Sequence, residues 1–179
     1  TGNDITLDFA TNDFGTATIS AGNTVAITDT NAMTIGSSTA TSLSVTSGGA
    51  LIFAGLAATT LNATASGTIT DTGTLVVSGT TTLAAGTGNN ITLDDTSNNF
   101  GIVVITSGAD VTLVDTNAID LGASTVTGAL DVTSGAGITD SGALSVGTTS
   151  RFEVAGSSDI TLDSTGTYTG AVTFTATSG

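Results

Sequence analysis

Short stretches in which apolar residues alternate with Thr, Ser or Asp recur along the whole chain. Such alternation points two side chains to one side of a β-strand and the residue between them to the other side. Gly, Asn, Asp and Ser, which favour turns, fill the intervals. The pattern predicts strands throughout, with the apolar pairs inward and the residues between them outward. These pairs begin at Ile5, Val25, Leu43, Leu61, Leu75, Ile91, Val111, Leu130, Leu144 and Ile160.

The chain also repeats itself over long distances. The sequence GNDITLDFATNDFG at residues 2–15 returns as GNNITLDDTSNNFG at 88–101, and SSDITLDSTGTYTG at 157–170 begins a third copy. We therefore divide the chain into copies at 1–87 and 88–156, with the start of a third copy at 157–179.

One block of the first copy has no counterpart in the second. The offset between equivalent residues is 86 or 87 in the first part of the copies and 69 in the last part, so 18 residues, roughly 49–66, are missing from the second copy. A clean deletion of this kind indicates that the missing block forms one removable structural unit.

Two all-β architectures compete for this pattern. Short strands separated by turns also suit an antiparallel sandwich or barrel. A solenoid tolerates the loss of an internal block better, because each coil contacts only its neighbours. We predict one all-β domain over residues 1–179, a parallel β-solenoid of about ten rungs of 14–20 residues. A right-handed coil is favoured because right-handed crossovers predominate in parallel β-structure.

Composition narrows the function classes. The chain has 15 acidic residues, one basic residue (Arg151) and a net charge of −14. Nothing here could neutralise phosphates, so we expect no nucleic acid partner. No apolar run is long enough for a membrane helix, so we expect no membrane insertion. The 39% of hydrophobic residues are enough to bury a core, which argues against disorder.

The acidic residues raise the question of catalysis or metal binding. A glycosidase needs two carboxylates at a defined separation, and the nearest candidates, Asp94 with Asp95 and the set Asp8, Asp94 and Asp163, have the composition of turns. We predict no enzyme, no catalytic residue and no cofactor. Calcium is the alternative left open, with Asp13, Asp94 and Asp95 as its candidate ligands, because Asp offers hard oxygen ligands.

The repeated text resembles a known class of proteins. Degenerate motifs such as ITLD, DTNA, VTSG and ITDSG, in a chain rich in Gly, Thr, Ser, Asn and Asp and without Lys or Cys, are similar to the repeat regions of giant bacterial surface exoproteins. These include filamentous-haemagglutinin-like adhesins and autotransporter-type passenger domains. The resemblance implies an extracellular or cell-surface β-helical stalk or fibre.

Two functional hypotheses follow. The first is a structural segment of a secreted or cell-surface bacterial β-helical protein. Neither end of the sequence carries a polar cap, so we expect a piece of a longer protein or filament whose partners are copies of itself or neighbouring segments, end to end. The alternative is an adhesin that binds a surface glycan or a host protein directly through its long corners, with the aromatic residues Phe14, Phe100 and Tyr168.

Overall fold

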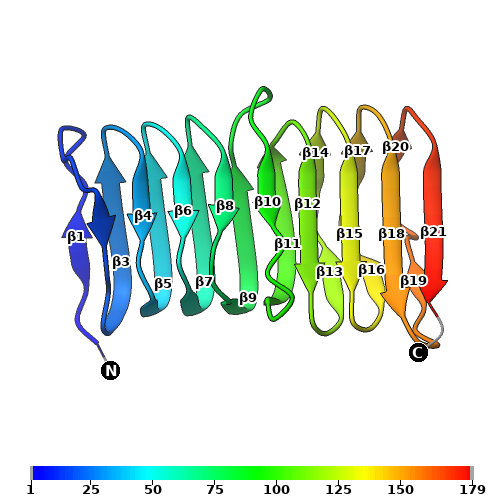
Figure 1. Ribbon diagram of the computed structural model, residues 1–179, viewed down its shortest axis with the longest axis horizontal. Coiled ribbons are helices and arrows are strands. Elements are labelled where there is room, and N and C mark those ends of the chain that lie inside the picture. Colours follow the sequence, from blue (N-terminus) through cyan, green and yellow to red (C-terminus); the bar gives the residue numbers. More distant parts are fainter. Residues whose placement is uncertain (1, 178–179) are drawn as a thin grey trace.

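The protein is a parallel β-solenoid, as the repeat pattern predicts. The computed structural model describes residues 2–177, and the chain winds through nine coils from one end of a rod to the other (Figure 1). Every strand pair is parallel. Successive coils stack with the strand spacing of a β-sheet, about 4.8 Å, so nine coils give a rod of roughly 40 Å.

Three sheets run along the rod. The first sheet contains β1 (Ile5–Leu7), β3 (Gly22–Asp29), β5 (Ser38–Ser47), β7 (Leu56–Ala65), β9 (Leu75–Ala84), β11 (Asn99–Ser107), β13 (Ile119–Leu121), β16 (Ile138–Asp140) and β19 (Ile160–Thr161). The second sheet contains β2 (Thr16–Ala17), β4 (Met33–Ile35), β6 (Leu51–Phe53), β8 (Ile69–Asp71), β10 (Ile91–Leu93), β12 (Val111–Asp115), β15 (Leu130–Ser134), β18 (Ser150–Ala155) and β21 (Val172–Thr177). The third, shorter sheet contains β14 (Ser124–Val126), β17 (Leu144–Val146) and β20 (Thr167–Tyr168).

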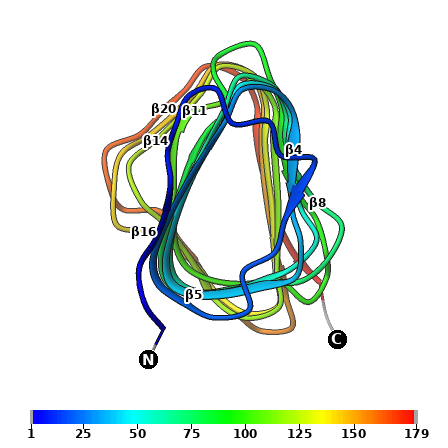
Figure 2. The ribbon, with the colours of Figure 1, turned by 90° about the vertical axis from the view of Figure 1, so that its left-hand side faces the viewer.

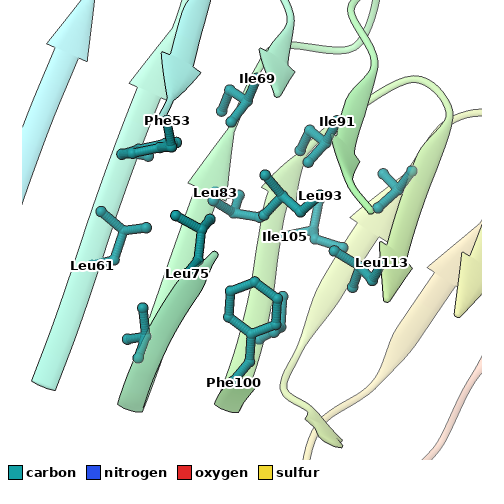
Figure 3. Close-up of a cluster of buried hydrophobic side chains, with 14 of the residues drawn as sticks. Phe53, Leu61, Ile69, Leu75, Leu83, Ile91, Leu93, Phe100, Ile105 and Leu113 are labelled. Atoms are coloured by element: carbon teal, nitrogen blue, oxygen red, sulfur yellow. The ribbon is translucent and has the colours of Figure 1, made fainter. Parts of the chain in front are cut away.

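The coils enclose one continuous apolar core. Viewed along the rod, they superpose as a rounded triangle (Figure 2). The alternating residues point inward as predicted, and Val25, Leu43, Ile91 and Val111 are each at most 1% exposed. Phe53 and neighbouring Leu and Ile side chains from successive coils pack against one another across the interior (Figure 3). Burial of aliphatic surface between stacked coils is therefore the main stabilising term.

The predicted strand starts do not form a single ladder. The number of residues in a coil varies along the rod. The coil from Met33 to its partner Leu51 is shorter than the coil from Val77 to its partner Phe100. Some of the shorter predicted steps, such as that from Leu130 to Leu144, lead from one sheet to another, whereas that from Leu61 to Leu75 stays in the first sheet, where Leu75 pairs with Leu56. The starts consequently divide among the three sheets, with Leu43 in the first, Val111 in the second and Leu144 in the third.

Equivalent strands of successive copies lie on different sheets. Ile5 of the first copy is in the first sheet, Ile91 of the second copy is in the second sheet, and Ile160 of the third copy returns to the first sheet. The offset between copies is not a whole number of coils, so each copy begins on a different side from its predecessor. The same sequence therefore builds either sheet.

Candidate functional site

A long corner lies at the start of each copy, and a further long connection, residues 85–90, joins β9 to β10. Residues 8–15 join β1 to β2, residues 94–98 join β10 to β11, and residues 162–166 join β19 to β20. Each copy begins on a different sheet from its predecessor, so the middle corner lies on a different side of the rod from the last one (Figure 2). These corners are the positions at which the sequence predicts ligand contacts.

A buried aspartate in the preceding coil holds the middle corner from one side. Asp71 is 9% exposed, and its carboxylate accepts the backbone N–H groups of Asp94 at 3.1 Å and Asp95 at 3.4 Å. The Asn98 side-chain amide donates to the same carboxylate at 2.6 Å. Such hydrogen bonds to an ionised acceptor are stronger than neutral ones, so Asp71 fixes the corner's shape.

The last corner repeats this arrangement with one bond missing. Asp140, 7% exposed, accepts the N–H groups of Asp163 at 2.8 Å and Ser164 at 3.1 Å through Oδ1. The residue equivalent to Asn98 is Thr167, and Oδ2 of Asp140 is buried without a hydrogen-bond partner among the described residues.

A second buried aspartate, in the following coil, holds the corner from the other side. Asp115 is 2% exposed and accepts the N–H of Phe100 at 2.6 Å and of Asn117 at 2.7 Å. Burial raises the pKa of Asp115, and the N–H groups of Phe100 and Asn117 oppose that rise. Asp29 accepts the N–H groups of Phe14 and Asn31 in the same way in the first copy.

The sequence analysis did not identify these four aspartates, because Asp in a turn-rich sequence is normally a solvated turn residue. A signal was present. The spacing from Phe to Asp is the same in two copies, at Phe14 with Asp29 and at Phe100 with Asp115. This equal spacing could have indicated a contact between neighbouring coils.

Two of the three candidate calcium ligands, Asp13 and Asp95, accept corner hydrogen bonds through their side chains. Asp13 accepts the side-chain amide of Asn31 at 2.9 Å. Asp95 accepts the N–H of Ser97 at 2.9 Å and the hydroxyl of Thr74 at 3.3 Å, while Asp94 is exposed. Within residues 2–177, no group of three or more His, Cys, Asp or Glu side chains is placed to hold a metal ion.

The three candidate aromatic residues pack against the core. Phe100 is 1% exposed, and Phe14 and Tyr168 are half-buried beside core residues. The Tyr168 ring makes an edge-to-face contact with Phe152, with 6.4 Å between the ring centroids. Burial raises the pKa of Tyr168, and the nearby negative charge of Asp140 raises it further.

The exposed aromatic residues are at the two ends of the rod. Phe9 is 77% exposed in the first coil, and Phe174 is 58% exposed in the last coil, stacked on Phe152 at 5.7 Å. Leu7, also in the first coil, is 40% exposed although it occupies an inward position. Each end face thus presents apolar side chains that would be covered in the middle of the solenoid.

The sides of the rod carry two shallow, open hollows. They have volumes of about 340 and 310 Å³ and share Thr39 and Ala57. Both lie over the first halves of β5 and β7, where the outward residues are small. No charged side chain lines either hollow, and the side chains there are hydroxyl-bearing or apolar.

The single basic residue has a local structural role. Arg151 lies on the outer face of β18 and contacts Asp131 at 2.8 Å and also Glu153. Partly exposed ion pairs of this kind contribute little to stability. Because both partners are acidic, no cationic surface is left around Arg151 for an anionic ligand.

Comparison with known proteins gives a family and no named relative. A search of curated proteins and a search of solved structures found no match. A family model described as "Repeats of unknown function (DUF5649)" matches residues 22–55, 42–107 and 108–178. Since these matches cover most of the sequence, the chain belongs to the family of DUF5649 repeats, and its repeats are coils of a β-solenoid.

Proposed function

We propose that the chain is a structural rod segment of an extracellular or cell-surface bacterial protein. One observation carries the proposal: a single apolar core runs through nine coils and reaches both end faces, where Leu7 and Phe174 remain exposed. A rod with open apolar ends is suited to continue into further coils at either end.

The surface chemistry supports a passive role. Buried Asp71 and Asp115 use their carboxylates to shape a corner, and the hollows on the side contain no acid, base or nucleophile beyond Thr and Ser hydroxyls. The net charge of −14 makes neighbouring rods repel one another laterally. A stalk that has to remain extended and separate benefits from this repulsion.

The extracellular location rests on the resemblance to surface exoproteins and on the composition. The described part of the chain contains no helix that is long and apolar enough to cross a membrane. Antibodies against the rod provide the test of location and role. We expect them to label intact cells that make the protein, at a distance from the cell surface. Labelling that requires permeabilised cells would contradict the proposal.

The alternative function, direct adhesion, gains a second candidate surface. Phe100 is buried, whereas Phe14 and Tyr168 at the corners are half-buried, and the open hollows around Ala57 are the other place where a neutral glycan would bind. A glycan array tests this directly. We expect no reproducible binding. Binding that is abolished by Ala57→Lys and retained in Thr64→Lys, on the same strand outside the hollows, would favour adhesion.

A further inference from the structure

The end face at β19, β20 and β21 belongs to a coil type that occurs twice more in the chain. Residues 157–177 are the third copy of the long-corner coil, and the other two, residues 2–21 and 88–108, are each covered by a following coil. Both covering coils have a V-x-[IL]-x-D-T-N-A-x-x-[IL]-G-x-S sequence. The chain therefore shows, in two independent places, what packs on such a face.

The two covered interfaces share their core contacts. Equivalent residues are paired with the same step along the chain in both interfaces. These pairs are Ile5 with Val25 and Ile91 with Val111 at the start of the coil, and Ala17 with Ile35 and Val103 with Leu121 farther along it. The corresponding residues of the open face are Ile160 and Val172, which are half-buried there.

The two interfaces also share their polar contacts. The Ser38 hydroxyl of the covering coil accepts the N–H of Ile19 at 3.0 Å, and the Ser124 hydroxyl accepts the N–H of Ile105 at 3.0 Å. In addition, a glycine N–H of each covering coil donates at 2.8 Å to a backbone carbonyl of the coil beneath it, from Gly36 in the first interface and Gly122 in the second.

The open face directs the equivalent backbone groups away from the rod. Carbonyl groups of Ala171 and Thr177 accept N–H groups from the preceding coil. Alternate residues of a parallel strand bond to opposite neighbours, so Val172 and Phe174 direct their N–H and C=O groups toward the open end. One contact differs, since the N–H of Thr169, equivalent to Phe100, already donates to Val146.

A glycine in the covering coil is required for close approach. A Cβ at Gly36 would lie 2.2 Å from the Thr18 hydroxyl oxygen, and a Cβ at Gly122 would lie 2.6 Å from a methyl of Val104. Thr173 occupies the equivalent place on the open face. If the first coil of a second copy were stacked there, Thr18 would take the glycine position.

The first coil of a second copy also has a different corner from the covering coil. Between the paired strands it has residues 8–15, where the covering coil has residues 28–33. The first coil therefore lacks the D-T-N-A segment, whose Asp29 accepts the corner N–H of Phe14 in the covered interface. Direct head-to-tail stacking of identical chains would thus set both a longer corner and Thr18 against this face.

We propose that the β19–β21 face is a docking surface for a D-T-N-A coil of this repeat family, and that the first coil of an identical chain does not fit it. This inference rests on the proposed structural role, and it specifies the neighbour that the rod accepts at this end.

The experiment extends the full chain beyond Gly179. One variant appends the sequence of residues 25–47, which places the added Val25 as far beyond Ile160 as Val25 lies beyond Ile5 in the chain itself. A control of equal length appends residues 5–27, and a third variant carries the first extension with Gly36→Thr. Hydrogen exchange of the β21 amides is measured in all of them, with the amides of β5 as an internal reference for the fold.

We expect the 25–47 extension to slow exchange in β21 at least about tenfold, since a covered strand opens less often than an end strand, and both other extensions to have a smaller effect. Equal protection by residues 5–27 would overturn the inference. A longer extension, residues 25–65, covers the case in which one added coil does not order, and failure of both this extension and residues 25–47 to protect β21, while β5 stays protected, would overturn it too.

Micrographs of the unextended chain at high concentration separate this inference from the structural role. We expect single short rods. Head-to-tail filaments of identical chains would overturn the docking specificity and leave the structural role supported, whereas antibody labelling restricted to permeabilised cells would contradict the proposed cell-surface role alone.

Discussion

Deletion of one coil is the most direct test of how this molecule is built. Removing residues 49–66 joins Gly48 to Gly67, and the N–H groups of Gly49 and Gly67 make equivalent bonds to the coil before each of them, to Asn31 and Gly49 respectively. The register on both sides of the cut is therefore preserved. Met33 pairs with Leu51 and Leu51 with Ile69, so the deletion brings Met33 against Ile69.

The expected cost is small because the removed coil takes its own core with it. Phe53 and Leu61 disappear together with the space that they fill, so no cavity remains. The new neighbours are compatible: Val45 meets Leu83, although Ser38 meets Leu75 in place of Leu56. At the usual stability per residue, a block of this length contributes about 1–3 kcal/mol to the free energy of unfolding.

Denaturant unfolding, followed by β circular dichroism, gives the measurement. We expect one cooperative transition with an m-value about one tenth lower, because about one tenth of the chain is lost, and a rod shortened by about 4.8 Å in scattering. The matched control deletes residues 49–57, half a coil, which puts β8 out of register with β4. Loss of the β signal in the full-coil deletion, or equal stability of the two deletions, would refute the solenoid reasoning.

Three further predictions test the core, a buried carboxylate and the end face. Val111→Asp should lower the free energy of unfolding by several kcal/mol, since it places a charge in the core. The control Thr112→Asn, on the outer face, should change this free energy by less than about 0.5 kcal/mol. Equal melting temperatures of the two variants would contradict the inward direction of Val111. Burial raises the pKa of Asp115, so its protonated form favours folding and this contribution is lost as pH rises through the folded pKa. Both carboxylate oxygens accept a backbone N–H, so Asp115→Asn, which sets an NH2 group against one of these donors, should lower the melting temperature at pH 7 by a margin that widens toward pH 3; a margin that narrows on acidification would contradict this sign. Tyr168 is the single Tyr in a chain without Trp, so an absorbance titration reports its pKa alone. The midpoint should lie above 10.0 and should fall in Asp140→Asn but not in the control Asp8→Asn. An unchanged midpoint in Asp140→Asn would contradict the charge effect of Asp140.

The fold class and the inward phase could be predicted from the sequence because both depend on local alternation. Val25 and Ile27 flank Ala26 with a spacing that only a strand converts into two buried side chains and one outward residue. The missing block of residues 49–66 gave the length of one coil, and the structure has a step of that same length at this place, between Leu43 and Leu61.

The corner chemistry could not be predicted in the same way, because it depends on which segments become neighbours. Asp71 meets the N–H group of Asp94 in the following coil, and Asp115 meets the N–H group of Phe100 in the preceding coil. Local composition indicated turn-forming Asp, whereas Asp71 and Asp115 are the last residues of β8 and β12. It could not show that these carboxylates are buried between coils, or that Phe100 is turned into the core.

The placement of strands on faces was beyond local pattern for a deeper reason. The segment ITLD forms β1 on the first sheet and β10 on the second, with equivalent neighbours in both places, Val25 and Val111. A strand in this solenoid is therefore specified by the coil that covers it and not by the face on which it lies. Each copy can start on a different side without changing its contacts, provided that a D-T-N-A coil follows the long corner. Coil order along the axis, rather than position around it, is what the repeated sequence encodes.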